Sequence, residues 1–91
     1  MTNLNPESYR EMIQVLHDFI KKVSDACDEM ELAGRTCVEN LGDDETGIRA
    51  NDQLVICIGK YRETLGMAKR VEDALQRQLG IIETANRIYS S

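Results

Sequence analysis

The 91-residue sequence contains no tryptophan, one proline, one phenylalanine and one histidine, and aromatic residues make up only 4% of it. So few aromatic side chains argue against a stacking platform for single-stranded nucleic acids. A formal net charge of −5 argues against the basic face with which proteins contact phosphates. No apolar run approaches the roughly 20 residues that span a bilayer. Residues 1–9 also lack the basic and apolar regions of a signal peptide. We therefore expect a cytoplasmic protein with no nucleic-acid partner and no stable membrane insertion.

The residues that usually carry catalysis or metal binding are also scarce. Cys27, Cys37 and Cys57 are too few for a structural zinc site and show no C-x-x-C spacing. We interpret them as free thiols in a reducing compartment, with a bridge between Cys27 and Cys57 as the alternative. His17 has no second histidine at helical spacing, which favours a position at the edge of a helix interface. No Walker, G-x-S-x-G or H-E-x-x-H motif occurs. The sequence therefore predicts a protein that is not an enzyme, with no catalytic, cofactor-binding or metal-binding residues.

Apolar residues in the first half recur at alternating spacings of four and three, which is the pattern of a packed helix face. This row consists of Tyr9, Ile13, Leu16, Ile20, Val23, Cys27, Met30, Gly34, Cys37 and Leu41. A second row beside it consists of Met12, Phe19, Ala26 and Ala33. Asn5 is suited to cap a helix and Pro6 to occupy its first position. The pattern predicts one helix over about residues 6–41, with Gly34 at a close helix approach or a kink.

The second half repeats this organisation after a glycine- and aspartate-rich turn at about residues 42–46. Gly42 is suited to end the first helix, and Asp43 or Asp44 to cap the second. The apolar row of the second half consists of Leu54, Ile58, Tyr61, Leu65, Ala68, Leu75, Leu79, Ile82 and Tyr89. Residues 54–58 are all apolar, but the sequence offers no second strand with which they could pair. We therefore predict a helix over about residues 46–88 and a single all-α domain, 1–91, built as a hairpin of two long antiparallel helices.

A single helical hairpin forms one layer, whereas a domain needs at least two packed layers to bury its apolar faces. Because the apolar stripe is wider than one neighbouring helix covers, we predict that two hairpins pair into a four-helix bundle. The pair is a homodimer or a heterodimer with a similar chain. Residues 1–45 carry a charge of −7 and residues 46–91 a charge of +2, which favours pairing of unlike helices. The predicted interface residues are Phe19, Ile20, Val23, Met30, Leu41, Leu54, Ile58, Tyr61, Leu65, Leu75 and Leu79.

Three segments resemble the WXG-type helical hairpins of type VII (ESX) secretion and the small helical partners of LXG toxins. Residues 4–9 (LNPESY) are similar to the start of the first helix in those proteins. Residues 30–34 (MELAG) and 39–44 (ENLGDD) are similar to their approach to the hairpin turn. The resemblance covers nearly the whole chain as architecture. It implies a partner that pairs with another hairpin or with the helical N-terminal domain of a toxin, and that forms a composite recognition surface for export.

The sequence departs from that family at two motifs. Without tryptophan it has no W-x-G motif, and Leu41-Gly42 is the nearest equivalent. The export signal, an aromatic residue followed four positions later by an acid, is missing, because Ile13 and Leu65 stand four residues after Tyr9 and Tyr61. These departures favour a partner protein over an independent export substrate. The expected localisation is therefore cytoplasmic, with export together with a partner left open.

Two other functional classes remain as alternatives. The same helices suit a general secretion or assembly chaperone, or a phage structural adaptor. A remote alternative is a small all-helical enzyme of the chorismate mutase type, which needs several cations to clamp a dicarboxylate. Residues 6–41 offer only Arg10, Lys21, Lys22 and Arg35, and none of them stands in the apolar row.

Overall fold

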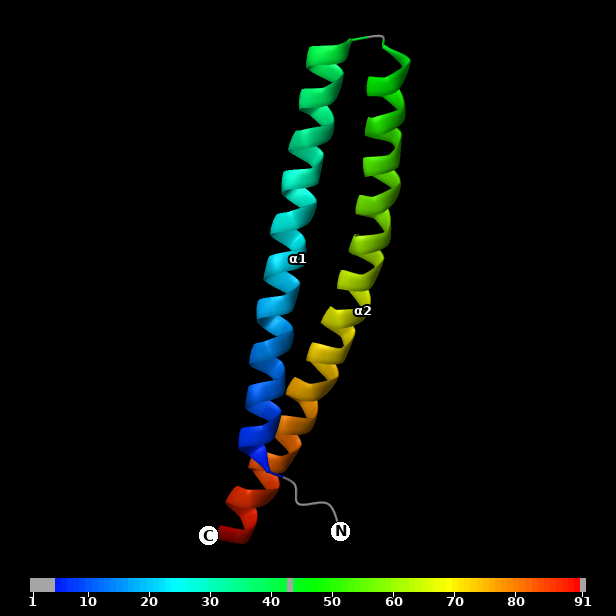
Figure 1. The fold of residues 1–91 in the computed structure, drawn as a ribbon. Helices are drawn as coiled ribbons and strands as arrows, with labels where there is room; N and C mark the ends of the chain where they lie inside the picture. Colours follow the sequence, from blue (N-terminus) through cyan, green and yellow to red (C-terminus); the bar gives the residue numbers. More distant parts are fainter. Residues whose placement is uncertain (1–4, 43, 91) are drawn as a thin grey trace.

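The computed structural model describes residues 5–42 and 44–90, and these form two helices with no strand. Helix α1 spans Pro6–Leu41 and helix α2 spans Glu45–Ser90. The two pack against each other and are joined at one end, while the start of α1 and the end of α2 lie at the other end (Figure 1). The predicted all-α class is confirmed. Helix α2 begins one residue earlier and ends two residues later than the predicted 46–88, which shortens the predicted turn.

Local hydrogen bonds explain where α1 begins and ends. The Asn5 side chain accepts a hydrogen bond from the Glu7 backbone N–H at 3.0 Å, and Pro6 occupies the first turn, where its missing N–H costs no hydrogen bond. At the other end, Gly42 has a φ of 58°, a conformation that favours glycine, and its N–H donates to the Val38 carbonyl oxygen at 2.8 Å. The chain therefore leaves the helix at Gly42 with its last turn satisfied.

A cap of the same kind starts α2 directly after the connection. The Asp44 carboxylate accepts a hydrogen bond from the Thr46 backbone N–H at 2.7 Å. Asp43, the other predicted cap, lies outside the described residues. Gly47 is buried, and a Cβ atom placed on it would lie 2.7 Å from the Leu41 Cβ. The absence of that atom lets the first turn of α2 approach the last turn of α1 closely.

Among the described residues, the interior is the interface between the two helices, which we call the seam. In α1 it contains the predicted row from Tyr9 to Cys37, all of whose members are buried or half-buried. Cys27 is only 2% exposed, and Ile82 of α2 only 3%. Gly34 marks a close approach rather than a break in α1, since a Cβ atom there would lie 2.5 Å from the Asn51 Oδ1 atom.

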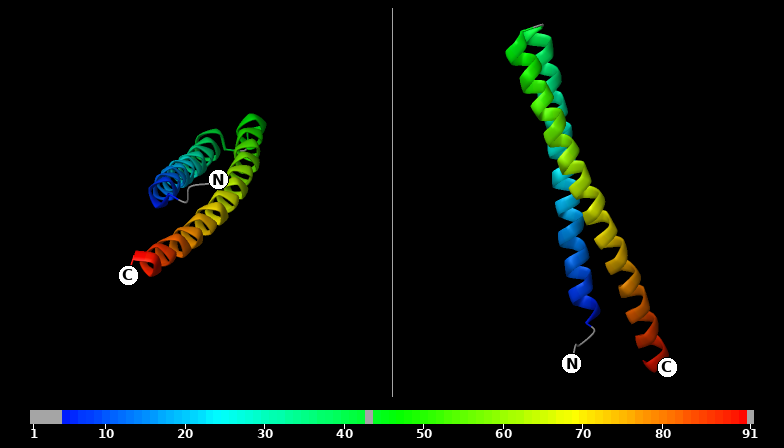
Figure 2. Two further views of the ribbon diagram at one scale, coloured as in Figure 1. Left: turned by 90° about the horizontal axis from the view of Figure 1, so that it is seen from below. Right: turned by 90° about the vertical axis from the view of Figure 1, so that its right-hand side faces the viewer.

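The seam gives the molecule the form of a thin rod. Its extents are 69 × 17 × 17 Å, and its radius of gyration is 20.4 Å, whereas a compact domain of this length has about 12 Å. Figure 2 shows the two helices inclined to each other, with their free ends separating in one of the views. Neither described helix contains a stretch long and apolar enough to cross a membrane. No second layer covers the outer faces of either helix within the described chain.

Candidate interaction surface

Most of the predicted interface residues lie in the seam. Those that are buried or half-buried there are Ile20, Val23, Met30, Leu54, Ile58, Leu65, Leu75 and Leu79. The remaining three, Phe19, Leu41 and Tyr61, are 42%, 47% and 45% exposed. The predicted set therefore combines two groups: residues that hold the chain's own helices together and residues that are open to a neighbour. A surface for another molecule has to be sought outside the seam.

One side of the seam, which we call the charged flank, carries ion pairs between the helices. The Arg10 Nη2 atom donates to the Glu83 Oε1 atom at 2.6 Å, and Arg62 pairs with Glu31 farther along the rod. The hydrogen bond to Glu83 is the main cause that raises the pKa of Arg10 above its usual value. Arg10 and Glu31 are three heptads apart, as are Arg62 and Glu83, so each helix places its charges on one face.

An acidic residue also stands in the seam itself. Glu72 occupies a position in the four–three spacing between Ala68 and Leu75, and its side chain is 16% exposed. The His17 Nδ1 atom lies 3.8 Å from the Glu72 Oε2 atom, and this oxygen is buried with no hydrogen-bond partner among the described residues. A buried acceptor without a partner destabilises the folded state. The contact also shows that residue 17 of α1 is level with residue 72 of α2.

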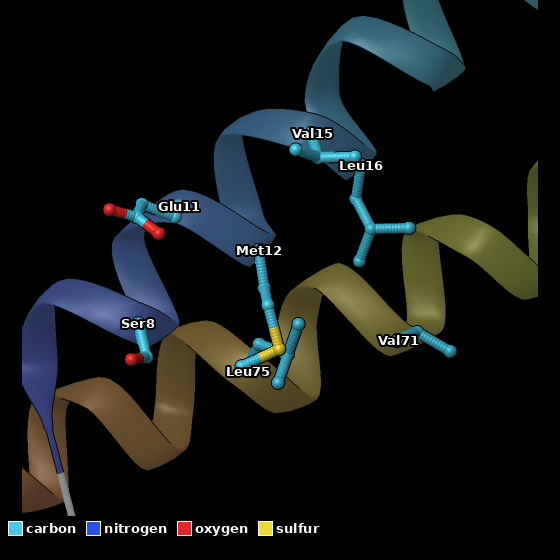
Figure 3. A pocket seen from close by; sticks show the side chains of 7 residues that line it. All are labelled: Ser8, Glu11, Met12, Val15, Leu16, Val71 and Leu75. Carbon is cyan, nitrogen blue, oxygen red and sulfur yellow. The ribbon is translucent and has the colours of Figure 1, made fainter.

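The opposite side of the seam, which we call the apolar flank, is built in α1 from large exposed side chains. Met12 and Phe19 are 43% and 42% exposed, and Val15 between them is 68% exposed. A groove follows this side of the seam, lined by Ser8, Glu11, Met12, Val15, Leu16, Val71 and Leu75. In Figure 3, Met12 and Leu16 point toward α2, whose Leu75 and Val71 line the same groove.

Helix α2 continues the apolar flank with a second row at alternating spacings of four and three. Its members are Met67, Val71, Ala74, Gln78, Ile81, Ala85 and Ile88. Val71 is 50% exposed and Ile81 is 62% exposed, although the adjacent Ile82 is buried. A second groove on this face is lined by Arg77, Gly80, Ile81, Thr84, Ala85 and Ile88. Sequence reasoning missed this row, yet the spacing that revealed the seam would have found it.

Near the connection, exposed apolar side chains also occur on the charged flank. Val38, Ile48 and Val55 are exposed there, and a small groove beside them is lined by Met30, Glu31, Arg35, Asn51, Leu54, Val55 and Ile58. This group is interrupted by Glu31 and Arg35. The apolar flank differs because its apolar rows continue along both helices at the end of the rod away from the connection.

Groups with chemical reactivity do not converge in the described parts of the chain. Residues 5–42 and 44–90 contain no cluster of three or more His, Cys, Asp or Glu side chains able to hold a metal ion. The three cysteines are free, with Cys27 buried and the other two half-buried, and the His17 side chain is 65% exposed. The four basic residues of α1 are all exposed, and Arg10 contacts Glu7 and Glu83.

The clearest geometric feature is thus an exposed apolar strip on one side of a two-helix rod, at the end away from the connection. Such a surface suits packing against another helical protein, whose own apolar rows would fill the grooves. No protein-family model matches this chain, and no curated protein or solved structure shows significant similarity to it.

Proposed function

We propose that this chain is a non-catalytic interaction protein whose two helices form an antiparallel hairpin that pairs with another helical hairpin. The exposed apolar flank is the observation that carries the proposal. Its α2 row has the spacing of a packed helix face, although the seam already buries the other row of the same helix. Two rows per helix are what a four-helix bundle requires, since each helix there contacts two neighbours.

The accessible surface supports the same proposal. The chain exposes 7028 Å², whereas a compact monomer of 10.3 kDa exposes about 5,400 Å². The excess of about 1,600 Å² is twice the area that each partner contributes to a typical protein–protein interface. Val15 and Ile81 are among the large apolar side chains that the rod leaves exposed. Covering the apolar flank with a second hairpin would remove them from water, a gain of about 25 cal/mol for each Å² of apolar surface.

The biological setting that we propose is export by a type VII secretion system, in which the chain is a partner or targeting factor. Support comes from the resemblance to WXG-type hairpins and to the small partners of LXG toxins. The short connection at Gly42 and Asp44, between helices of 36 and 46 residues, agrees with that architecture. In this role the chain pairs with a hairpin or with the helical N-terminal segment of a toxin, and the pair displays a recognition surface that neither chain has alone.

Co-expression tests this function directly. The chain is produced together with the helical N-terminal segment of a large toxin encoded beside it, and the complex is purified through a tag on the toxin segment. We expect a complex of fixed stoichiometry by light scattering, and loss of toxin export when the gene of this chain is deleted. Unimpaired export, or a locus that encodes flagellar, injectisome or phage-tail components instead, would contradict the proposal and favour a chaperone or a structural adaptor.

A further inference from the structure

The outer edges of the apolar flank carry opposite charges on the two helices. Beyond the apolar row of α1 stand Glu11 and Asp18, one heptad apart and both exposed. Beyond the apolar row of α2 stand Arg70 and Arg77, also one heptad apart and exposed. Glu11 and Arg77 each line a groove of the flank. The flank is therefore an apolar strip with an acidic edge on α1 and a basic edge on α2.

The acidic residues at the edge of α1 and the arginines at the edge of α2 lie at matching positions along the axis of the rod. Because His17 contacts Glu72, residue 18 is level with about residue 71 and residue 11 with about residue 78. Asp18 is thus level with Arg70, and Glu11 is level with Arg77, in each case to within about one helical turn. On one molecule the two edges are held apart by the width of the rod. Only another molecule can bring them together.

We propose that the apolar flank binds the same flank of a second copy of this chain, with each α1 lying over the α2 of the other copy. A two-fold axis parallel to the rod produces this arrangement, because it exchanges the two helices while keeping every residue at its height. Asp18 and Glu11 of one copy then face Arg70 and Arg77 of the other, twice in the dimer. The apolar rows between the edges pack against each other, and the two connections lie at the same end of the bundle.

Charge selects this arrangement over the other symmetric one. A two-fold axis perpendicular to the rod would lay α1 on α1, which places acidic edges against each other and costs stability through repulsion between like charges. Closer to the connection, Asp25 and Glu63 continue the two edges and are both acidic, so the favourable pairs lie at the end away from the connection. This is also the end at which the apolar rows of both helices are exposed.

The inference rests on the proposed function and names the hairpin partner as a second copy. Sedimentation equilibrium of the purified chain at micromolar concentration provides the first test. We expect a mass of twice 10.3 kDa. Val71→Asp on the flank is expected to raise the dimer dissociation constant at least 100-fold. Glu63→Gln, which removes a charge at the like-charged end of the edges, is the matched control and should leave the dimer at least as tight.

Charge reversal provides a second test that does not depend on the apolar residues. Arg70→Glu with Arg77→Glu should weaken the dimer at least tenfold, as should Glu11→Arg with Asp18→Arg. All four substitutions together should restore it, since the edges are then opposite in charge again. Far-ultraviolet circular dichroism checks that each variant remains helical, which we expect because all four positions lie outside the seam.

Three results would overturn the inference. The first is a monomeric wild-type chain, and the second is a dimer that Val71→Asp leaves unchanged. The third is a set of four charge reversals that does not restore the dimer weakened by the reversals on one helix. Each result is distinct from a failure of the proposed function. A monomer that still binds a toxin segment through the apolar flank would overturn the self-association alone. A dimer formed as described, in a cell whose export does not need it, would support this inference and contradict the secretion role.

Discussion

Helix α2 carries two apolar rows of the same spacing, but one is buried and the other is largely exposed. The seam row contains Ile82, which is 3% exposed, and the row of the apolar flank contains its neighbour Ile81, which is 62% exposed. Both rows would be interpreted as buried faces from their periodicity. The difference teaches that spacing identifies a face suited to packing, whereas the number of helices in the chain decides how many such faces are covered. With two helices, one face of each is covered by the other.

The largest effect should come from placing a charge on each row in turn. Ile82→Asp buries a carboxylate between the helices and should lower the free energy of unfolding by about 3–5 kcal/mol, enough to unfold a small domain. Ile81→Asp should cost less than about 0.5 kcal/mol in the folding of the hairpin, because the side chain is exposed and Ile and Asp differ little in helix propensity. Urea unfolding followed by circular dichroism at several protein concentrations measures both. Equal losses for the two variants would show that the rows do not differ in burial.

Glycine substitutions sharpen the contrast between covered and open faces. Gly47→Ala places a methyl group against the Leu41 Cβ atom, which is fixed to the backbone, and should cost about 1–3 kcal/mol. Gly59→Ala meets no atom within 4 Å and should stabilise α2 by up to about 1 kcal/mol. Thermal unfolding of the two variants beside the wild type tests this. A stabilising Gly47→Ala would mean that the approach of the helix ends is looser than described.

An effect smaller than that of Gly47→Ala is expected from removing the acid that lies in the seam. Glu72→Leu replaces a buried oxygen without a hydrogen-bond partner by an apolar group, and should raise the free energy of unfolding by about 1–2 kcal/mol. The exposed Glu63→Leu is the matched control and should change it by less than about 0.5 kcal/mol. Denaturant unfolding compares them. Destabilisation by Glu72→Leu would indicate that its contact with His17 contributes more than the burial of the oxygen costs.

The smallest effect should come from the charged flank. A double-mutant cycle of Glu31→Ala and Arg62→Ala should give a coupling energy below about 1 kcal/mol, because the two side chains are 37% and 54% exposed and solvent screens their attraction. Raising the salt concentration should reduce it further. A coupling of several kcal/mol would show that the ion pairs, rather than the seam, hold the helices together.

The elements of the fold were accessible to sequence reasoning because the signals were local. The cap at Asn5, the helix end at Gly42 and the spacing from Tyr9 to Cys37 each act within a few residues of chain. The assignment of Gly34 to a close approach or a kink was left open, because the choice depends on Asn51 of the other helix.

The candidate surface was predicted less well than the fold. Leu41 and Tyr61 follow the seam spacing but are exposed. Leu41 is the last residue of α1, whereas Tyr61 lies within α2 between the buried Ile58 and Leu65. The row from Met67 to Ile88 was overlooked because the more strongly apolar seam row lies in the same segment, shifted by one position. The burial of each row depends on how the two helices rotate against each other, which no local signal fixes.

The single connection between Gly42 and Asp44 also has a consequence for the order in which the molecule forms. Contacts beside it close short loops and cost little entropy, whereas contacts at the free ends close loops of more than seventy residues. The contacts between the helices should therefore form from the connection outward and break first at the opposite end. Residues near Met12 and Ile81 would then exchange their amide hydrogens faster than those near Gly47, unless a bound neighbour clamps them. A binding partner would accordingly stabilise the contacts between the free ends of the helices and slow their opening.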